Sequence, residues 1–165
     1  MQTIIRTEEP GDADGIRRVE RAAFGREAEA ELVDAVREMG AALLSLVAVE
    51  GGEIVGHALF TAVAVGSGAG VGLGPLAVPP EHQGRGIGSA LVREGLTKLR
   101  AAGHGAVIVV GEPRYYRRFG FVPASRFGVR WDRPVPDEVF MALELRGGAL
   151  REGGVVRYHA VFEGV

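Results

Sequence analysis

The stretch of residues 71–99 passes from an apolar run through a glycine-rich turn into a helical pattern. Val71–Val78 is typical of a buried strand, Gly84–Gly88 holds three glycines in five residues, and Ile87–Leu99 repeats apolar residues at helical spacing. Glycine lets a ligand approach the backbone, and the first turn of a helix offers unpaired N–H groups at the positive end of its dipole. The order predicts a strand–turn–helix unit that binds phosphate, with Arg85 adding positive charge. The plain alternative is a helix start whose glycines serve only the turn.

Composition narrows the classes of protein to consider. The chain of 165 residues predicts a single domain over residues 1–165, and its net charge of −2 gives no basic surface for nucleic acid or an anionic membrane. Cysteine is absent, which excludes disulfides, thiolate metal sites and a cysteine nucleophile. Residues 1–10 are polar and acidic, and no apolar run approaches a membrane-spanning length. We therefore expect a cytoplasmic protein.

The rest of the chain predicts an α/β protein of the α+β type with one mixed sheet, because helices alternate with strands only in the second half. Gly51-Gly52 between two apolar runs predicts a hairpin. Asp12 or Asp14 is expected to cap the first helix. The expected strands are residues 4–7, 43–50, 54–65, 71–78, 107–110, 139–145 and, more weakly, 155–162; the expected helices are residues 12–24 and 27–38, a long one from Ile87 to before Gly103, and a short one carrying Tyr115 and Tyr116.

Two motifs in this order resemble the GNAT superfamily of N-acetyltransferases. The pattern Gln83-x-x-Gly86-x-Gly88 after Leu76-Ala77-Val78 is similar to its acetyl-coenzyme A motif, and residues 116–121 are similar to its tyrosine motif. The strings GPLAVPPEHQGRGIGSALV, PRYYRRFGF and EVFMALEL resemble the YhbS-like branch. The resemblance implies a single-domain fold whose mostly antiparallel, twisted central sheet is flanked by helices and splayed at the cofactor site. It also implies acetyl-coenzyme A-dependent transfer to an amine.

The resemblance further implies where acetyl-coenzyme A would lie. The backbone of Leu76–Val78 would bind the pantetheine arm as if it were an added strand. Gly72, Gly74 and Pro75 suit the splay that such a strand needs. No metal is expected, because the four histidines lack metal-ligand spacing. The cofactor-binding residues implied are Leu76, Ala77, Val78, Gln83, Gly84, Arg85, Gly86, Ile87, Gly88 and Ser89.

Acetyl transfer from a thioester to an amine needs a leaving-group partner, an oxyanion donor and a base. The resemblance assigns Tyr116 to the leaving thiolate and the Val78 N–H to the oxyanion. A phenol of pKa ~10 gives up its proton to a thiolate with difficulty, so a hydrogen bond is as good an expectation as full transfer. Glu112, after the strand 107–110, is the best-placed carboxylate base, ahead of Glu81 and His82.

The acceptor is expected to be a small-molecule or peptide amine, in a pocket lined by Phe24, Glu27, Glu31 and Phe140. Without cysteine or a Gly-x-Ser-x-Gly elbow, we expect direct transfer in a ternary complex. A homodimer is conceivable but has no marker in the sequence. Two alternatives stay open: a nucleotide-binding Rossmann unit, which Gly84-x-Gly86-x-x-Ser89 partly imitates, and a non-catalytic acyl-coenzyme A sensing or interaction module.

Overall fold

The computed structural model describes residues 2–163, which group into two compact units. The first unit comprises residues 2–61, 74–95 and 160–163; the second comprises residues 62–73 and 96–159. Three elements contribute residues to both units: strand β3 (Glu53–Val65), strand β4 (Gly68–Ala77) and helix α3 (Ile87–Ala101). The prediction of a single domain is not tested by this division.

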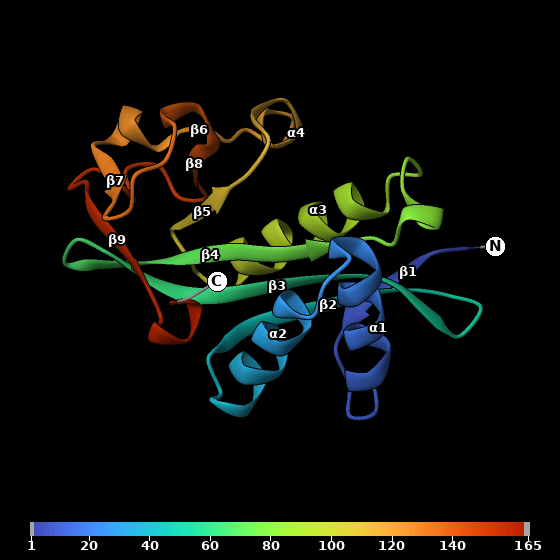
Figure 1. The fold of residues 1–165 in the computed structure, drawn as a ribbon. Helices are drawn as coiled ribbons and strands as arrows, with labels where there is room; N and C mark the ends of the chain where they lie inside the picture. Colours follow the sequence, from blue (N-terminus) through green and yellow to red (C-terminus); the bar gives the residue numbers. More distant parts are fainter. Residues whose placement is uncertain (1, 164–165) are drawn as a thin grey trace. The chain divides into compact units, whose positions relative to one another are not determined.

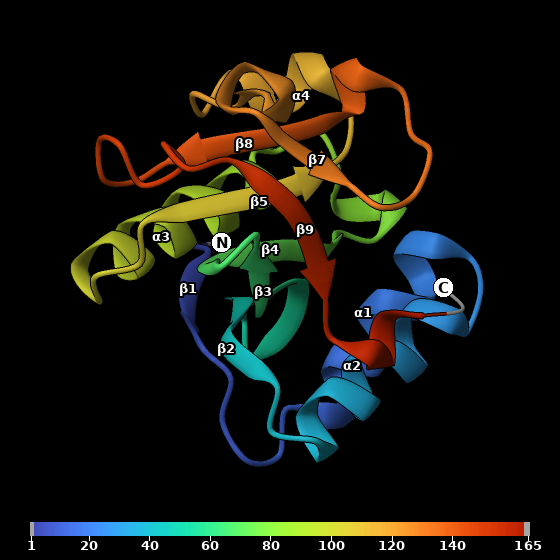
Figure 2. The ribbon, with the colours of Figure 1, turned by 90° about the vertical axis from the view of Figure 1, so that its left-hand side faces the viewer.

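The first unit is built on antiparallel strands. Strand β1 (Ile4–Thr7) pairs with β2 (Ala42–Glu50), and β2 pairs with β3 through a hairpin at Gly51-Gly52, as predicted. Helices α1 (Ala13–Phe24) and α2 (Ala28–Glu38) lie beside each other, as Figures 1 and 2 show. The apolar residues of α1 and α2 share one buried cluster with residues of β2 and β3, so the core of this unit lies between these helices and the strands.

Two glycine contacts show which face of β3 meets which helix. A Cβ on Gly56 would lie 2.9 Å from Ile87, and one on Gly95 would lie 2.2 Å from Phe60, so Gly56 and Phe60 face α3. Side chains alternate along a strand, so His57 and Leu59 point to the other face. Leu59 indeed packs with the α1 and α2 cluster. The face toward α1 and α2 is therefore where the side chain of His57 is buried.

The second unit is held by both parallel and antiparallel pairs. Strand β4 pairs in parallel with β5 (Ala106–Val110), β5 pairs antiparallel with β8 (Phe140–Glu144), and β8 pairs antiparallel with β6 (Val122–Pro123). Strand β9 (Gly154–Tyr158) pairs antiparallel with β3 and in parallel with β7 (Val129–Trp131). The short helix α4 (Pro113–Arg117) follows β5.

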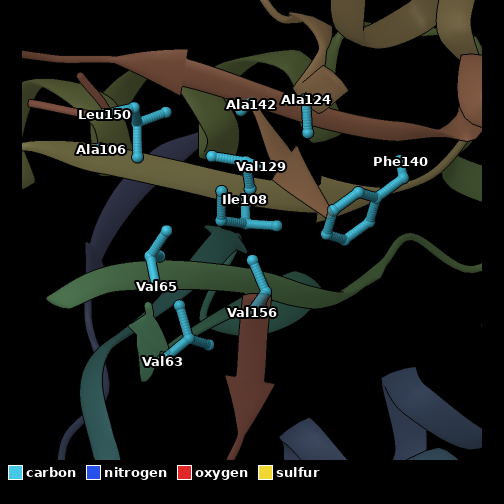
Figure 3. Close-up of a cluster of buried hydrophobic side chains, with 10 residues drawn as sticks. All are labelled: Val63, Val65, Ala106, Ile108, Ala124, Val129, Phe140, Ala142, Leu150 and Val156. Atoms are coloured by element: carbon cyan, nitrogen blue, oxygen red, sulfur yellow. The ribbon is translucent and has the colours of Figure 1, made fainter. Parts of the chain in front are cut away.

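A cluster of buried apolar side chains forms the core of the second unit (Figure 3). Ile108 lies among Val65, Val129 and Val156, which come from three other strands. Fully burying a Val, Leu, Ile or Phe side chain stabilises a fold by roughly 1.5–3 kcal/mol, and seven of the ten residues are of these types, so this cluster contributes strongly to the stability of the unit.

The mixed α/β fold with a mostly antiparallel sheet flanked by helices is confirmed. Some boundaries differ from the prediction: β4 begins at Gly68 instead of after a loop of residues 66–70, and β9 ends at Tyr158 before a short 3-10 turn. Asp12 makes no side-chain cap bond to α1, because its carboxylate binds Arg6 and the N–H of Glu9 instead. Within residues 2–163 no helix is long and apolar enough to cross a membrane.

Candidate functional site

The turn between β4 and α3 leaves open space at its glycines. Gly84 and Gly86 have φ values of +77° and +84°, and a Cβ at either position would meet no atom within 4 Å. The backbone of Gly86 leads directly into α3, where its carbonyl accepts the N–H of Ala90 at 3.0 Å. Open backbone before the first turn of a helix is the arrangement that phosphate groups bind.

Gln83 connects this turn to the end of the preceding strand. Its side-chain amide donates a hydrogen bond to the carbonyl oxygen of Val78 at 2.8 Å. The resemblance places Gln83 near the pyrophosphate, and the structure gives its amide nitrogen a partner on the strand side of the turn. The bond fixes the carbonyl of the residue whose N–H is the expected oxyanion donor.

Arg85 forms an ion pair with a carboxylate on β2. Its Nη2 lies 2.6 Å from Glu50 Oε2 and its Nη1 lies 3.2 Å from Glu50 Oε1, while the hydroxyl of Thr3 donates to the same carboxylate. The hydrogen bonds from Thr3 and then Arg85 hold the pKa of Glu50 below its usual value. Arg85 Nη1 also lies 3.2 Å from His82 Nδ1. The positive charge predicted to attract anions is thus already paired.

The strand that leads into the turn changes its surroundings at Gly74. Pairing of β4 with β5 covers Val71–Leu73, and the Gly74-Pro75 peptide bond that follows is cis. Ala77 is completely buried in the cluster of the first unit, and Leu76 and Val78 are half-buried. Ile87 and Ser89 are buried at the start of α3.

Tyr116 is buried among aromatic rings of the second unit. Its ring makes edge contacts with Tyr115 and Phe121, at centroid distances of 5.0 and 5.7 Å. A Cβ on Gly111 would lie 2.3 Å from Tyr116 Cε2, so this ring position requires glycine there. Burial, and then the neighbouring Tyr115, raise the pKa of the Tyr116 hydroxyl. A hydroxyl with a raised pKa keeps its proton and donates a hydrogen bond.

Glu112 is the N-cap of α4. Its two carboxylate oxygens accept hydrogen bonds from the backbone N–H groups of Arg114 and Tyr115, at 3.1 and 3.0 Å. Pro113 at the first helical position completes a common helix start. The carboxylate predicted to be a base therefore has a structural function, and it lies exposed. The predicted site residues form two sets, Leu76–Ser89 in the first unit and Glu112 with Tyr116 in the second.

The residues expected to line an acceptor pocket have different surroundings. Phe24, Glu27 and Glu31 are exposed, and Glu27 pairs with Arg21. Phe140 is buried in the second unit with its ring stacked on Trp131, so it is a core residue there. Within residues 2–163, no group of three or more histidine, cysteine or acidic side chains could hold a metal ion.

Sequence reasoning missed one group of polar residues. His57, considered from the sequence only as a metal ligand, bonds to Glu20 and Ser45 on its two ring nitrogens. The three residues come from β3, α1 and β2, so no local motif joins them. Only the position of His57 within the otherwise apolar run of residues 54–60 could have indicated a buried polar partner.

Comparisons with known proteins show which family the chain belongs to. Residues 4–124 match the model of the acetyltransferase (GNAT) domain. The chain is 39% identical to the uncharacterised N-acetyltransferase YhbS of Escherichia coli K12, over 96% of this chain and 98% of YhbS. It is 42% identical to the uncharacterised N-acetyltransferase YjhQ of the same organism, over 77% of this chain and 74% of YjhQ.

Solved structures give the same result. The crystal structure of Escherichia coli YhbS in complex with CoA matches with a TM-score of 0.94 at 38% identity, covering 98% of this chain and 92% of that one. A GNAT family acetyltransferase from Brucella melitensis in complex with acetyl-CoA matches with a TM-score of 0.82 at 40% identity, covering 98% and 99%. Fold, motifs and these relatives agree, and the chain belongs to the GNAT family of acetyltransferases.

Proposed function

We propose that the protein transfers an acetyl group from acetyl-coenzyme A directly to a primary amine. The observation that carries this proposal is the open, positive-φ backbone of Gly84 and Gly86 ahead of α3. Two relatives of about 40% identity were crystallised with CoA or acetyl-CoA, and each covers nearly the whole of this chain. The family relationship supports the acetyltransferase reaction, and the residue roles below are part of the proposal.

In the proposed complex, backbone groups bind the donor. The N–H groups of Gly84–Gly88 bind the pyrophosphate at the start of α3, and Leu76–Val78 bind the pantetheine arm as an added strand would. Gln83 holds the Val78 carbonyl, which orients the peptide chain at the point where the thioester would lie. Arg85, fixed by Glu50, holds the turn in shape and offers its remaining N–H groups to the phosphates.

The chemical step forms one bond and breaks another. The amine nitrogen attacks the thioester carbon, the C–N bond forms, and the C–S bond breaks to release the coenzyme A thiolate. The Val78 N–H stabilises the oxyanion, and the Tyr116 hydroxyl donates a hydrogen bond to the thiolate. Because burial raises the pKa of Tyr116, the hydrogen bond is favoured over full proton transfer.

The amine must lose a proton before it attacks. At pH 7 this costs about 4.6 kcal/mol for a lysine side chain of pKa ~10.4 but only about 1 kcal/mol for an α-amine of pKa ~7.7. Glu112 already serves as the N-cap of α4, with each of its oxygens accepting one backbone N–H. Water is sufficient for an acceptor of low pKa, so we propose an α-amine of a small molecule or peptide as the preferred acceptor.

The test follows thiol release from acetyl-coenzyme A with a panel of amines: small amines, peptides with a free N-terminus, peptides with lysine only, and aminoglycosides. We expect turnover with at least one amine, and peptides or small molecules with a free α-amine to react faster than lysine side chains. Calorimetric titration with acetyl-coenzyme A distinguishes the enzyme from a protein that only binds the donor. Tight binding with no turnover on any amine would support the acyl-coenzyme A sensing module, which the absence of an ionisable side chain on β4 favours.

A further inference from the structure

Four polar side chains of the first unit form a continuous chain of hydrogen bonds. Ser45 Oγ lies 2.6 Å from Glu8 Oε1 and 2.8 Å from His57 Nε2. His57 Nδ1 lies 2.7 Å from Glu20 Oε2. His57 and Glu20 are completely buried between α1 and the strands, and Ser45 is half-buried. The chain thus runs from the interior toward the surface at Glu8, whose side chain is 19% exposed.

Counting protons shows that this chain holds one more than its residues carry at neutral pH. Three contacts of hydrogen-bond length need three protons, one for each. The Ser45 hydroxyl supplies one and a neutral His57 supplies one, while ionised Glu8 and Glu20 supply none. The third proton must come from solution, and it must reside on Glu8, His57 or Glu20.

The directions of the bonds locate the extra proton. Burial alone raises the pKa of Glu8, but the hydrogen bonds from Arg37 and Ser45 outweigh it and lower the pKa, so Glu8 is ionised and only accepts. Ser45 therefore donates to Glu8, and His57 Nε2–H donates to Ser45. The extra proton then lies between His57 Nδ1 and Glu20 Oε2. Glu20 Oε1 has no hydrogen-bond partner, as suits a neutral carboxyl group, and burial raises the pKa of Glu20.

Charged groups on the surrounding elements favour the same arrangement. Arg37 on α2 binds Glu8 and Asp34, and Arg17 on α1 binds Asp34 as well. Although burial opposes it, the hydrogen bond from Arg37 lowers the pKa of Glu8 and keeps the surface end of the chain anionic. Glu29 on α2, itself paired with Arg26, raises the pKa of Glu20 at the buried end. The charged groups connected to the chain are therefore Arg37 and Glu29 on α2, with Asp34 on α2 bound to Arg37 and Arg17 on α1 bound to Asp34.

A pocket gives this chain access to solvent. The pocket has a volume of about 280 Å³, and Glu8 and Ser45 line it together with Arg37. Val33 and Leu44 contribute apolar walls. A proton can therefore enter or leave at Glu8 although His57 and Glu20 are sealed from water.

We propose that Glu8, Ser45, His57 and Glu20 form a proton relay, which stores one proton beside the buried Glu20 and exchanges it with solvent through the pocket at Glu8. In one transfer, Glu20 gives its proton to His57 Nδ1, His57 Nε2 gives its proton to Ser45 Oγ, and Ser45 gives its proton to Glu8 Oε1. Each of three protons moves across one hydrogen bond, so Glu20 loses a proton, Glu8 gains one, and His57 and Ser45 each keep the same number. The proposal is independent of acetyl-coenzyme A.

Ser45, His57 and Glu20 also have the spacing of a serine-hydrolase triad. Glu8 argues against that function. Its carboxylate takes the only proton of Ser45 and lies 2.6 Å from the oxygen that would become the nucleophile, where negative charge would build up. The relay uses the same residues as proton carriers instead. The relay therefore connects α1 to strands β2 and β3 by hydrogen bonds that change with the protonation of Glu20.

Nitrogen NMR of the His57 ring tests the relay directly. At pH 7 we expect Nε2 to be protonated, with a proton shared between Nδ1 and Glu20. In Glu8→Gln the amide donates to Ser45, so Ser45 donates to Nε2 and His57 changes to the Nδ1–H tautomer. In Glu20→Gln the amide donates to Nδ1, so the Nε2–H tautomer stays. Opposite His57 tautomers in Glu8→Gln and Glu20→Gln would support the relay. A neutral Nδ1–H tautomer in the wild type would overturn it, and so would an ionised Glu20 beside an unprotonated Nδ1.

The pH dependence of unfolding gives a second readout. Because the pKa of Glu20 is raised in the folded protein, the stored proton stabilises the fold below the ordinary glutamate pKa, and this contribution is lost as the pH rises through the raised pKa. The unfolding equilibrium constant of the wild type should rise up to tenfold per pH unit in this window, relative to Glu20→Gln. Equal slopes for the two proteins would contradict the relay. If Glu20→Gln does not fold, the wild-type ring spectrum still decides.

Discussion

Gly86 and Gly111 both precede a helix, but the missing side chain serves opposite purposes. At Gly86 the φ is +84° and a Cβ would meet nothing within 4 Å, so glycine supplies a backbone conformation and leaves room for a ligand. At Gly111 a Cβ would lie 2.3 Å from the ring of Tyr116, so glycine makes room for a side chain. In the proposed function, the first position concerns donor binding and the second the leaving group. Substitutions should therefore separate binding from turnover.

Tyr116→Phe should have the largest effect. Loss of one donor to developing charge lowers a rate by about 100-fold, and we expect kcat to fall by that factor. The Kd for acetyl-coenzyme A should change less than about twofold. Tyr115→Phe, one residue earlier on α4, is the matched control and should keep its turnover. Unchanged kcat in Tyr116→Phe would remove Tyr116 from the reaction.

Gly111→Ala should have the next largest effect on turnover. The added methyl group must displace the Tyr116 ring, and such overpacking costs about 1–3 kcal/mol of the free energy of unfolding. We expect kcat to fall roughly tenfold, because a misplaced hydroxyl loses part of its interaction with the thiolate. Thermal denaturation and thiol-release kinetics measure the two effects. A destabilised variant with wild-type kcat would show that the Tyr116 ring position does not matter for catalysis.

Gly86→Ala should instead affect donor binding. An alanine at φ +84° is strained by roughly 1–2 kcal/mol, which the loop relieves by leaving the conformation that binds phosphate. We expect the Kd for acetyl-coenzyme A to rise about fivefold or more, with kcat at saturation retained. Gly103→Ala is the control, because its φ of +90° and open surroundings give the same strain outside the loop. A comparable loss of affinity in the control would mean that global strain, and not the loop, is responsible.

Glu112→Gln should have the smallest effect. A glutamine side chain keeps an oxygen for the cap of α4, so we expect the free energy of unfolding to fall by less than about 1 kcal/mol. We also expect kcat to change less than about threefold and the rise of the rate toward alkaline pH to remain. Disappearance of that rise would assign the general base to Glu112 after all. A pH–rate profile of the two proteins distinguishes these results.

The features that the sequence predicted correctly are those set by residues close together in the chain. The helix periodicity after Ile87 and the Gly51-Gly52 hairpin act between near neighbours, and both were found at the predicted places. Strands β6 and β7, of two and three residues, are too short to leave a pattern. The Glu112-Pro113 pair could have indicated a helix cap, since a capping acceptor followed by proline is a common helix start.

The polar contacts were the part that sequence could not supply. Glu20 and His57 are 37 residues apart, and Arg85 and Glu50 are 35 apart. Each pair meets only because a helix or a turn packs against a strand, and the spacing of the residues in the sequence does not indicate that packing. The glycine-rich motif could therefore be recognised from the sequence, but the pairing of its Arg85 with Glu50 could not.

The ion pair between Arg85 and Glu50 limits which anions the proposed phosphate-binding turn can bind tightly. A guanidinium already held by a carboxylate adds little net attraction, so an ion with a single charge must compete with a neighbour that is always present. A ligand with several linked phosphate charges binds the helix start and the backbone amides together, and can share Arg85 with Glu50. Because Glu50 already neutralises Arg85, we expect the proposed site to select a nucleotide-like carrier over free phosphate.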